Sequence, residues 1–214
     1  MDPIFWSNVG IDVQTALGTA LTITAISKAA TGVCTYTGAD PTDGAYVLMS
    51  VQGMYQVNDR VMRIDNVNTT AKTFELEGED TTDYDTFVSG SAQVITFGAA
   101  FSSVQNIAVS GGDPEFADTT TIHDNVRKRT PVIVSPLSFS MTNLFNLSDA
   151  GFIECNKAYK AKAKRAIRLR FGTGARMVLV GYPAAAGVPT GQAQGVVQTT
   201  VSIEAQNIPS VYAT

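Results

Sequence analysis

The sequence predicts a mainly β chain with a single α-helix and a separate small all-β module. Short β-prone runs bounded by Gly, Pro, Asn and Asp recur along most of its 214 residues. One segment alone has the three-to-four-residue apolar spacing of an amphipathic helix. In addition, residues 17–98 are acidic while the rest of the chain is slightly basic, which indicates two structural units.

The N-terminal residues 3–16 predict a strand or an arm, because apolar and polar side chains alternate there. Trp6 is expected to pack in the core or at its rim, and the alternative is an anchor in a neighbouring subunit. The first residues are acidic and lack a long apolar stretch, so no signal peptide is expected.

Residues 17–98 read as the small all-β module, with six short runs separated by turn residues. They contain 4 Lys and Arg against 10 Asp and Glu, a net charge of −6. Leu21, Ile23 and Ala25 are expected to share one face of its first strand. The acidic tract at 75–85 lacks the spacing of a calcium loop, so a solvated outer face is expected.

After a strand at 101–109, residues 111–130 form a polar excursion that is too long for a simple connector. Its ends differ in sign, and opposite charges on one loop can pair between identical subunits stacked head to tail. The alternative is a flexible surface loop. We expect the segment to lack order in the free subunit. The charged residues are Asp113, Glu115 and Asp118 early, and Arg127, Lys128 and Arg129 late.

A further strand is predicted at 132–141, followed by the helix at about 149–164. Asp149 is placed to cap the helix N-terminus, where its charge also suits the helix dipole. The expected buried face holds Phe152, Cys155, Tyr159 and Ala163, and the expected polar face holds Lys157, Lys160 and Lys164.

Directly after the helix, residues 166–182 predict a β-hairpin with a turn at Gly172-Thr173-Gly174. Arg168 and Arg170 alternate with apolar residues, so they are expected on a wet, basic face. That face is either simply solvated or directed at an acidic partner. A loop at 184–194, a long strand at 195–208 and a last short strand at 210–214 complete the chain.

Several function classes have no support in the sequence. A net charge of −4 argues against a dedicated nucleic-acid binder, whose phosphate contacts need clustered cations. Cys34 and Cys155 read as reduced core residues, and with His123 they are too few for a zinc site. Phosphate-binding and nucleophile motifs are missing. We therefore expect no catalytic, cofactor-binding or metal site and no enzyme, and no apolar run is long enough for membrane insertion.

Four stretches resemble the major tail tube proteins of long, flexible-tailed (siphovirus-type) bacteriophages. The resemblance covers about 99–213 and the N-terminal arm, so residues 17–98 are interpreted as an inserted module. The stretches are GGDPEFADTTTIHDNVRKRTP, SFSMTNLFNLSDAGF, RAIRLRFGTGARMVLVGYP and GQAQGVVQTTVSIEAQNIPSVYA.

The resemblance implies a β-sandwich or barrel with one flanking helix, formed by 1–16 and 99–214, with the 17–98 module on the outer surface. It further implies that six copies form a ring and that stacked rings form a hollow tube for DNA ejection, assembled in the host cytoplasm and retained in the virion. The implied partners are the tape measure, tail terminator and distal tail proteins, together with DNA that passes without sequence-specific binding. The candidate interface residues are Trp6, the six charged residues of the excursion, Arg168 and Arg170.

Two alternatives from other classes remain at this point. The 17–98 module is compatible with an adhesin that binds a receptor or a glycan. A β-class esterase or glycosidase is the third reading, because any two of the 19 carboxylates can meet in space. The first alternative predicts a small oligomer rather than rings or filaments, and the second predicts substrate turnover.

Overall fold

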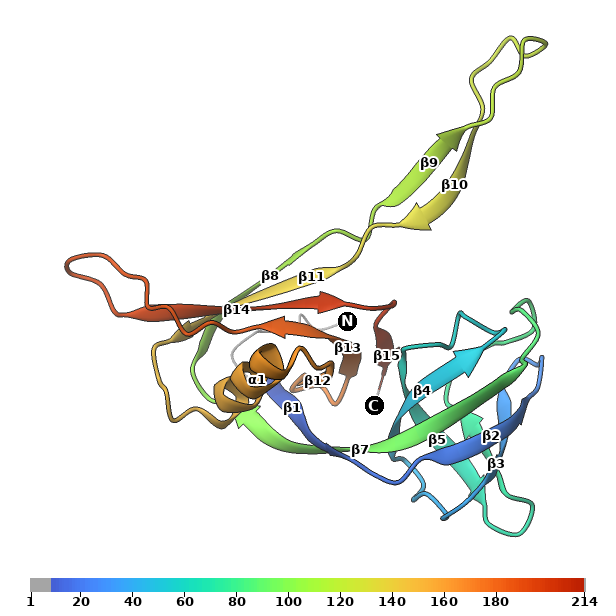
Figure 1. Ribbon diagram of the computed structural model, residues 1–214, viewed down its shortest axis with the longest axis horizontal. Coiled ribbons are helices and arrows are strands. Elements are labelled where there is room, and N and C mark those ends of the chain that lie inside the picture. Colours follow the sequence, from blue (N-terminus) through green and yellow to red (C-terminus); the bar gives the residue numbers. More distant parts are fainter. Residues whose placement is uncertain (1–8, 214) are drawn as a thin grey trace.

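The computed structural model describes residues 9–213, and the prediction of a mainly β fold with one helix is confirmed (Figure 1). Most strands belong to one continuous hydrogen-bonded system, which closes into a barrel at one end and forms a curved sheet at the other. No helix among these residues has the length and apolar character needed to cross a membrane.

The barrel has six strands, and it closes because the first and last strands of its sheet pair with each other. Its interior holds large side chains with no exposed surface, such as Tyr36, Met49 and Phe74. Each predicted β-prone run between 19 and 97 contributes one strand. In spatial order the strands are β2 (Leu21–Ile26), β3 (Val33–Thr37), β6 (Thr73–Leu76), β5 (Val61–Asn68), β4 (Tyr46–Gln52) and β7 (Ser89–Phe101).

One detail of strand β2 differs from the prediction. Leu21 and Ile23 are buried as expected, but Ala25 is exposed and Ile26 is buried instead. The pairing register of β2 with β3 shifts between Ile23 and Ala25, which is a β-bulge. A bulge inserts one extra residue and therefore reverses the faces that follow it.

The curved sheet begins where β7 leaves the barrel and pairs with the N-terminal strand. The predicted hairpin after the helix lies at its centre, and the short C-terminal strand pairs with the second strand of that hairpin. In spatial order after β7 the strands are β1 (Gly10–Leu17), β12 (Arg165–Arg170), β13 (Arg176–Ala184), β14 (Gln198–Ala205), β11 (Ser138–Leu144) and β8 (Val104–Ser110), with β15 (Ser210–Tyr212) beside β13.

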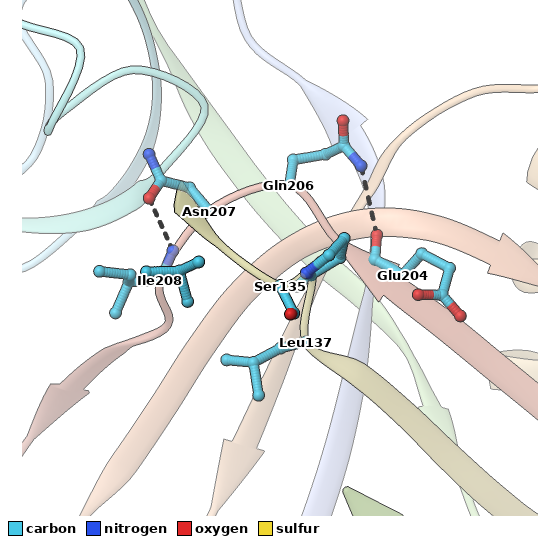
Figure 2. Close-up of a pocket in the computed structure, with 9 residues that line it drawn as sticks. Ser135, Leu137, Glu204, Gln206, Asn207 and Ile208 are labelled. Atoms are coloured by element: carbon cyan, nitrogen blue, oxygen red, sulfur yellow. Dashed lines mark hydrogen bonds between the residues drawn. The ribbon is translucent and has the colours of Figure 1, made fainter. Parts of the chain in front are cut away.

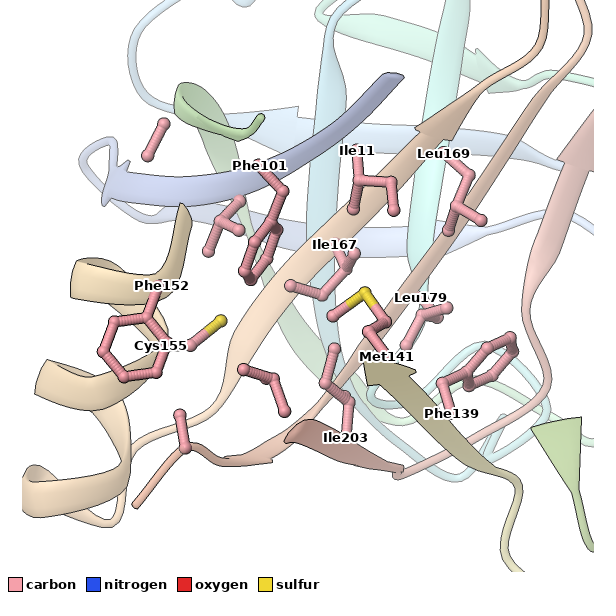
Figure 3. Close-up of a cluster of buried hydrophobic side chains, with 14 of the residues drawn as sticks. Ile11, Phe101, Phe139, Met141, Phe152, Cys155, Ile167, Leu169, Leu179 and Ile203 are labelled. Atoms are coloured by element: carbon pink, nitrogen blue, oxygen red, sulfur yellow. The ribbon is translucent and has the colours of Figure 1, made fainter. Parts of the chain in front are cut away.

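The curved sheet encloses an apolar core together with the helix (Figure 3). Ile167 and Leu169 alternate inward on β12 as the sequence predicts, and they meet Phe139 and Met141 of β11 across the core. The predicted strand at 132–141 is interrupted by Ser135-Pro136-Leu137, so only its second part joins this sheet. Proline lacks the N–H that a continuous ladder needs.

The helix α1 (Ala150–Ala161) confirms the predicted segment, and Lys162 ends it in the left-handed conformation. Phe152 and Cys155 are buried as expected, but Ala158 takes the third buried position, and Tyr159 is 46% exposed. The expected apolar face was therefore wrong at Tyr159, because the side chain of the preceding residue, Ala158, faces the core instead. Ala163 lies beyond the helix end.

Asp149 joins the helix start to the end of β7. One carboxylate oxygen accepts the Phe152 N–H at 3.1 Å as an N-cap. The other accepts the backbone N–H and the hydroxyl of Ser102 at 2.8 and 2.7 Å. Burial opposes ionisation, but these bonds outweigh it and lower the pKa of Asp149.

A third apolar cluster packs the barrel against the curved sheet, with Tyr46 and Val61 on one side and Val178, Val180 and Tyr212 on the other. Ion pairs lie next to this cluster, and they include two glutamates of the acidic tract at 75–85, which was predicted to be solvated. Arg60 bonds both Glu79 and Ser210, and Arg63 bonds Glu77 while its backbone N–H donates to the Tyr212 hydroxyl at 2.7 Å. Glu77 and Glu79 thus have arginine partners that no local pattern reveals.

The two remaining sequence-level expectations have different outcomes. Cys34 and Cys155 are buried free thiols, which confirms the reduced core reading. The division into 1–16 plus 99–214 and 17–98 stays a prediction, since β1 and β7 each run through both units without a break.

We expect Asp149→Ala to lower the free energy of unfolding by about 2 kcal/mol, because an N-cap is lost and the two donors of Ser102 lose their charged acceptor. Chemical denaturation monitored by circular dichroism measures the change. Ser148→Ala is the matched control, since Ser148 is exposed and an exposed substitution changes stability by at most about 0.5 kcal/mol.

The same residue predicts a pH dependence. Because the folded pKa of Asp149 is lowered, its carboxylate stabilises the fold fully above the pKa of the unfolded state, and this contribution is lost as the pH falls through the folded pKa. The stability difference between wild type and Asp149→Asn should therefore be largest near neutral pH and shrink in acid. A difference independent of pH would contradict the ionised cap.

Candidate assembly interface

The polar excursion at 111–130 forms a β-hairpin that projects from the curved sheet (Figure 1). Strand β9 (Pro114–Asp118) pairs antiparallel with β10 (Arg129–Val134), in the register Asp118 to Arg129 and Pro114 to Val134. The expectation of an unordered loop was wrong, because the β-prone residues 132–134 supply the second strand. The sequence interpretation had assigned them to the next strand along the chain.

The hairpin emerges directly from the neighbouring strands β8 and β11. At its base the Gly112 N–H donates to the Ser135 carbonyl at 3.2 Å, and the Ser135 N–H donates to the Asp113 carbonyl at 2.9 Å. Gly111 has a φ of 83°, and a Cβ there would lie 2.0 Å from the Pro136 carbonyl oxygen. The two segments at the base of the hairpin therefore approach each other so closely that position 111 requires glycine.

Both hairpin strands are exposed along their whole length, and they pair with each other and with no other described strand. The register places Pro114, Phe116, Pro131 and Val134 on one face of the ribbon. Phe116 is 53% exposed, although an aromatic ring gains most from burial. A two-stranded ribbon is marginally stable by itself in water, so this apolar face is suited to a partner surface.

The predicted opposite charges lie on this hairpin and partly pair within it. Arg127 lies 3.4 Å from Asp118, and Lys128 pairs with Asp124. The Thr120 hydroxyl and backbone lower the pKa of Asp118, and Lys128 and Thr121 lower the pKa of Asp124. Arg129 lies opposite Asp118 in the ladder.

Asp113 and Glu115 complete the acidic group of the hairpin. Asp113 precedes β9 and Glu115 lies within it, and both are exposed. Within residues 9–213 neither carboxylate lies within ion-pair distance of a lysine or arginine. Both lie at the base of the hairpin, at the opposite end from Arg127 and Lys128 near the tip.

The exposed apolar residues of the hairpin were missed by the sequence interpretation, which weighed its charges only. Ile122 at the tip is 98% exposed and Val126 is 74% exposed. The signal that could have found them is the presence of large apolar side chains in a segment whose length excludes burial within one compact unit.

A cavity of about 490 Å³ lies at the base of the hairpin (Figure 2). It lies between the segment that links β10 to β11 and the segment that follows β14. Val134, Leu137 and Ile208 give it apolar walls, and Glu204 is its one ionisable group. Such a lining suits an apolar side chain from another protein better than a charged cofactor. Within residues 9–213 no three His, Cys, Asp or Glu lie close enough to hold a metal ion.

Arg168 and Arg170 do not form an open basic face, because both bind Asp12 on the adjacent strand β1. Four nitrogen-to-oxygen distances between the two guanidinium groups and this carboxylate lie between 2.7 and 3.0 Å. Arg168 also lies over the rings of Phe97 and Tyr46, 4.5 and 5.5 Å from their centres. Asp12 is 6% exposed.

Gly10 leaves room for this cluster, since a Cβ there would lie 2.9 Å from a guanidinium nitrogen of Arg170 and the end of that side chain would have to shift. Of the candidate interface residues, the structure thus brings together the hairpin charges, and separately Arg168 with Arg170. Trp6 lies outside the described residues.

Comparison with known proteins identifies a family. A family model described as phage tail tube protein, TTP, matches residues 52–214. The match includes the hairpin, the helix and the entire C-terminal part of the curved sheet, and it starts at the end of β4 within the barrel. No curated protein matches the chain significantly.

We expect Asp12→Ala to lower the free energy of unfolding by about 3 kcal/mol, because it leaves two arginines without their buried counter-ion. Arg170→Ala should cost about 1 kcal/mol or less, since the Arg170 side chain is 48% exposed and its charge is solvated. Urea unfolding of the two variants checks this order. Equal losses would show that Asp12 does not hold the cluster together.

Proposed function

This chain belongs to the phage tail tube protein family, and we propose that it is the repeating subunit of a hollow tube made of stacked six-membered rings. The proposal includes the passage of DNA through the tube during ejection and the flexible-tailed, siphovirus type of virion. The observation that carries it is the projecting hairpin, with its exposed apolar face and charged tip.

Head-to-tail stacking is supported by two exposed apolar surfaces at opposite ends of the subunit. One is the hairpin. The other lies before the helix and in the loop preceding β14 (Figure 1). The Phe145 N–H donates to the Val197 carbonyl at 2.9 Å and joins these two segments. Different surfaces that meet between identical copies give a heterologous contact, which repeats along an axis. The second surface consists of Leu144, Phe145, Leu147, Val188, Val196 and Val197.

Within this scheme the hairpin of one ring contacts the next ring. The apolar face around Phe116 supplies burial, and the acidic base and basic tip supply charge complementarity between rings. Trp6 in the N-terminal arm is proposed to contact a neighbouring subunit.

Arg168 and Arg170 are proposed to stand near such a contact. Of the two, Arg170 has the exposed side chain that a neighbour could reach, since Arg168 is covered by Phe97 and Tyr46.

The 17–98 module is proposed to face outward from the tube. A separate buried core supports its treatment as a compact unit, and its net charge of −6 suits exposure to solvent. The remaining proposed partners are the tape measure, tail terminator and distal tail proteins. Assembly in the host cytoplasm fits the two free buried thiols.

Removal of the hairpin tests the proposal. Replacing residues 113–134 by Asn-Gly joins Gly112 to Ser135, which are already hydrogen-bonded neighbours. We expect a folded subunit with an unchanged circular dichroism spectrum of the barrel and sheet, but no tubes by negative-stain electron microscopy. A variant that still forms tubes would contradict the role of the hairpin between rings.

A point variant gives a graded form of this test. Phe116→Ala should raise the protein concentration needed for tube formation about tenfold or more, since losing about 1.5–3 kcal/mol of aromatic burial at each contact corresponds to that factor. Thr69→Ala on an exposed barrel turn is the matched control and should leave the threshold unchanged. Light scattering over a concentration series measures the threshold.

A further inference from the structure

The outward face of strands β8, β11 and β14 is made of small, neutral polar side chains. Cross-strand pairs place Asn106 opposite Thr142, Thr142 opposite Thr200, and Ser140 opposite Ser202. The alternate residues Phe139, Met141, Val201 and Ile203 point the other way, into the core (Figure 3). This smooth polar face therefore results from strict alternation along three strands.

No lysine or arginine lies on these three strands. Glu204 is the only charged residue within them, and the Ser138 hydroxyl donates to its carboxylate at 2.7 Å. Cations are plentiful elsewhere in the described chain. Lys157 and Lys160 belong to the helix, and Arg127 and Lys128 to the hairpin tip. Of the four arginines on the neighbouring strands β12 and β13, Arg168 and Arg170 are bound by Asp12, and Arg165 and Arg176 lie outside the three strands.

We propose that this face of β8, β11 and β14 lines the bore of the tube and is the surface along which double-stranded DNA moves. The inference rests on the proposed function and adds to it the residues that meet the DNA. Lysine and arginine contacts to phosphates supply most of the non-specific affinity for DNA. A face with hydroxyl and amide groups, and one repelling carboxylate per subunit, gives DNA no such site at which to be held.

The placement of the other elements agrees with this assignment. The hairpin continues the direction of β8 and β11, so a hairpin that reaches the next ring sets these strands along the tube (Figure 1). The core and the helix lie on the other side of the three strands.

Cysteine accessibility in assembled tubes tests the proposal. Cys34 and Cys155 are fully buried, and burial raises the pKa of each thiol to about 12, so neither should react. Thr142→Cys and Ser202→Cys introduce a thiol on the proposed bore. Thr69→Cys introduces one on an exposed barrel turn as the control.

Each variant is treated with a small maleimide and with a maleimide carried on a polyethylene glycol too large to enter the bore. In free subunits all three variants should react with both reagents. In tubes, the large reagent should react with Thr142→Cys and Ser202→Cys at least an order of magnitude more slowly, while the small reagent still labels them and Thr69→Cys reacts with both.

Tubes in which the large reagent labels Thr142→Cys and Ser202→Cys as fast as in free subunits would overturn the inference, because the face would then be external. Protection from both reagents would also overturn it, because the face would then be buried between subunits. Failure of the wild-type chain to form tubes contradicts the proposed function instead, so the two failures are distinguishable.

Discussion

The architecture depends on the hydrogen bonding of one long strand, β7. Its first half pairs with β4 on one side and β2 on the other, which closes the barrel. Its second half pairs with β1 and starts the curved sheet. Close approach along this strand needs glycine: a Cβ on Gly90 would lie 2.9 Å from the Ser50 carbonyl oxygen, and one on Gly98 would lie 2.5 Å from the Thr15 hydroxyl. One strand thus fixes where the barrel stands relative to the sheet.

Side chains reinforce this joint away from the strand itself. The cluster around Tyr46, Val61 and Tyr212 is buried, and Arg60 and Arg63 bond to carboxylates and to β15 around it. Buried ion pairs of this kind add little net stability, but the loss of one partner is costly. Their role here is to make the mutual position of barrel and sheet specific. A subunit with a defined shape is what a repeating assembly requires.

The hairpin and the polar face of β8, β11 and β14 differ from this buried joint, because both leave surface exposed within the subunit. The hairpin exposes large apolar groups such as Phe116 and Ile122, which are suited to another copy. The face of β8, β11 and β14 exposes hydroxyl groups that gain little from any contact. In the proposed tube, the hairpin supplies adhesion between subunits and the polar face supplies a surface without adhesion to DNA. Asp12 supports this separation, since it binds two arginines that would otherwise add positive charge to the sheet.

The sequence by itself determined the element types, because alternation of apolar residues and capping chemistry are local properties. The helix start at Asp149, the strand around Ile167 and Leu169 and the strands of the barrel follow from them. The candidate assembly surface was located by the length and charge of 111–130, but its apolar strand residues were not recognised. Only the tertiary structure decided that Glu79 meets Arg60, that Asp12 binds Arg168, and that Val134 pairs with Pro114. These are contacts between distant residues, and a periodic pattern states which face a residue occupies without stating what lies opposite that face.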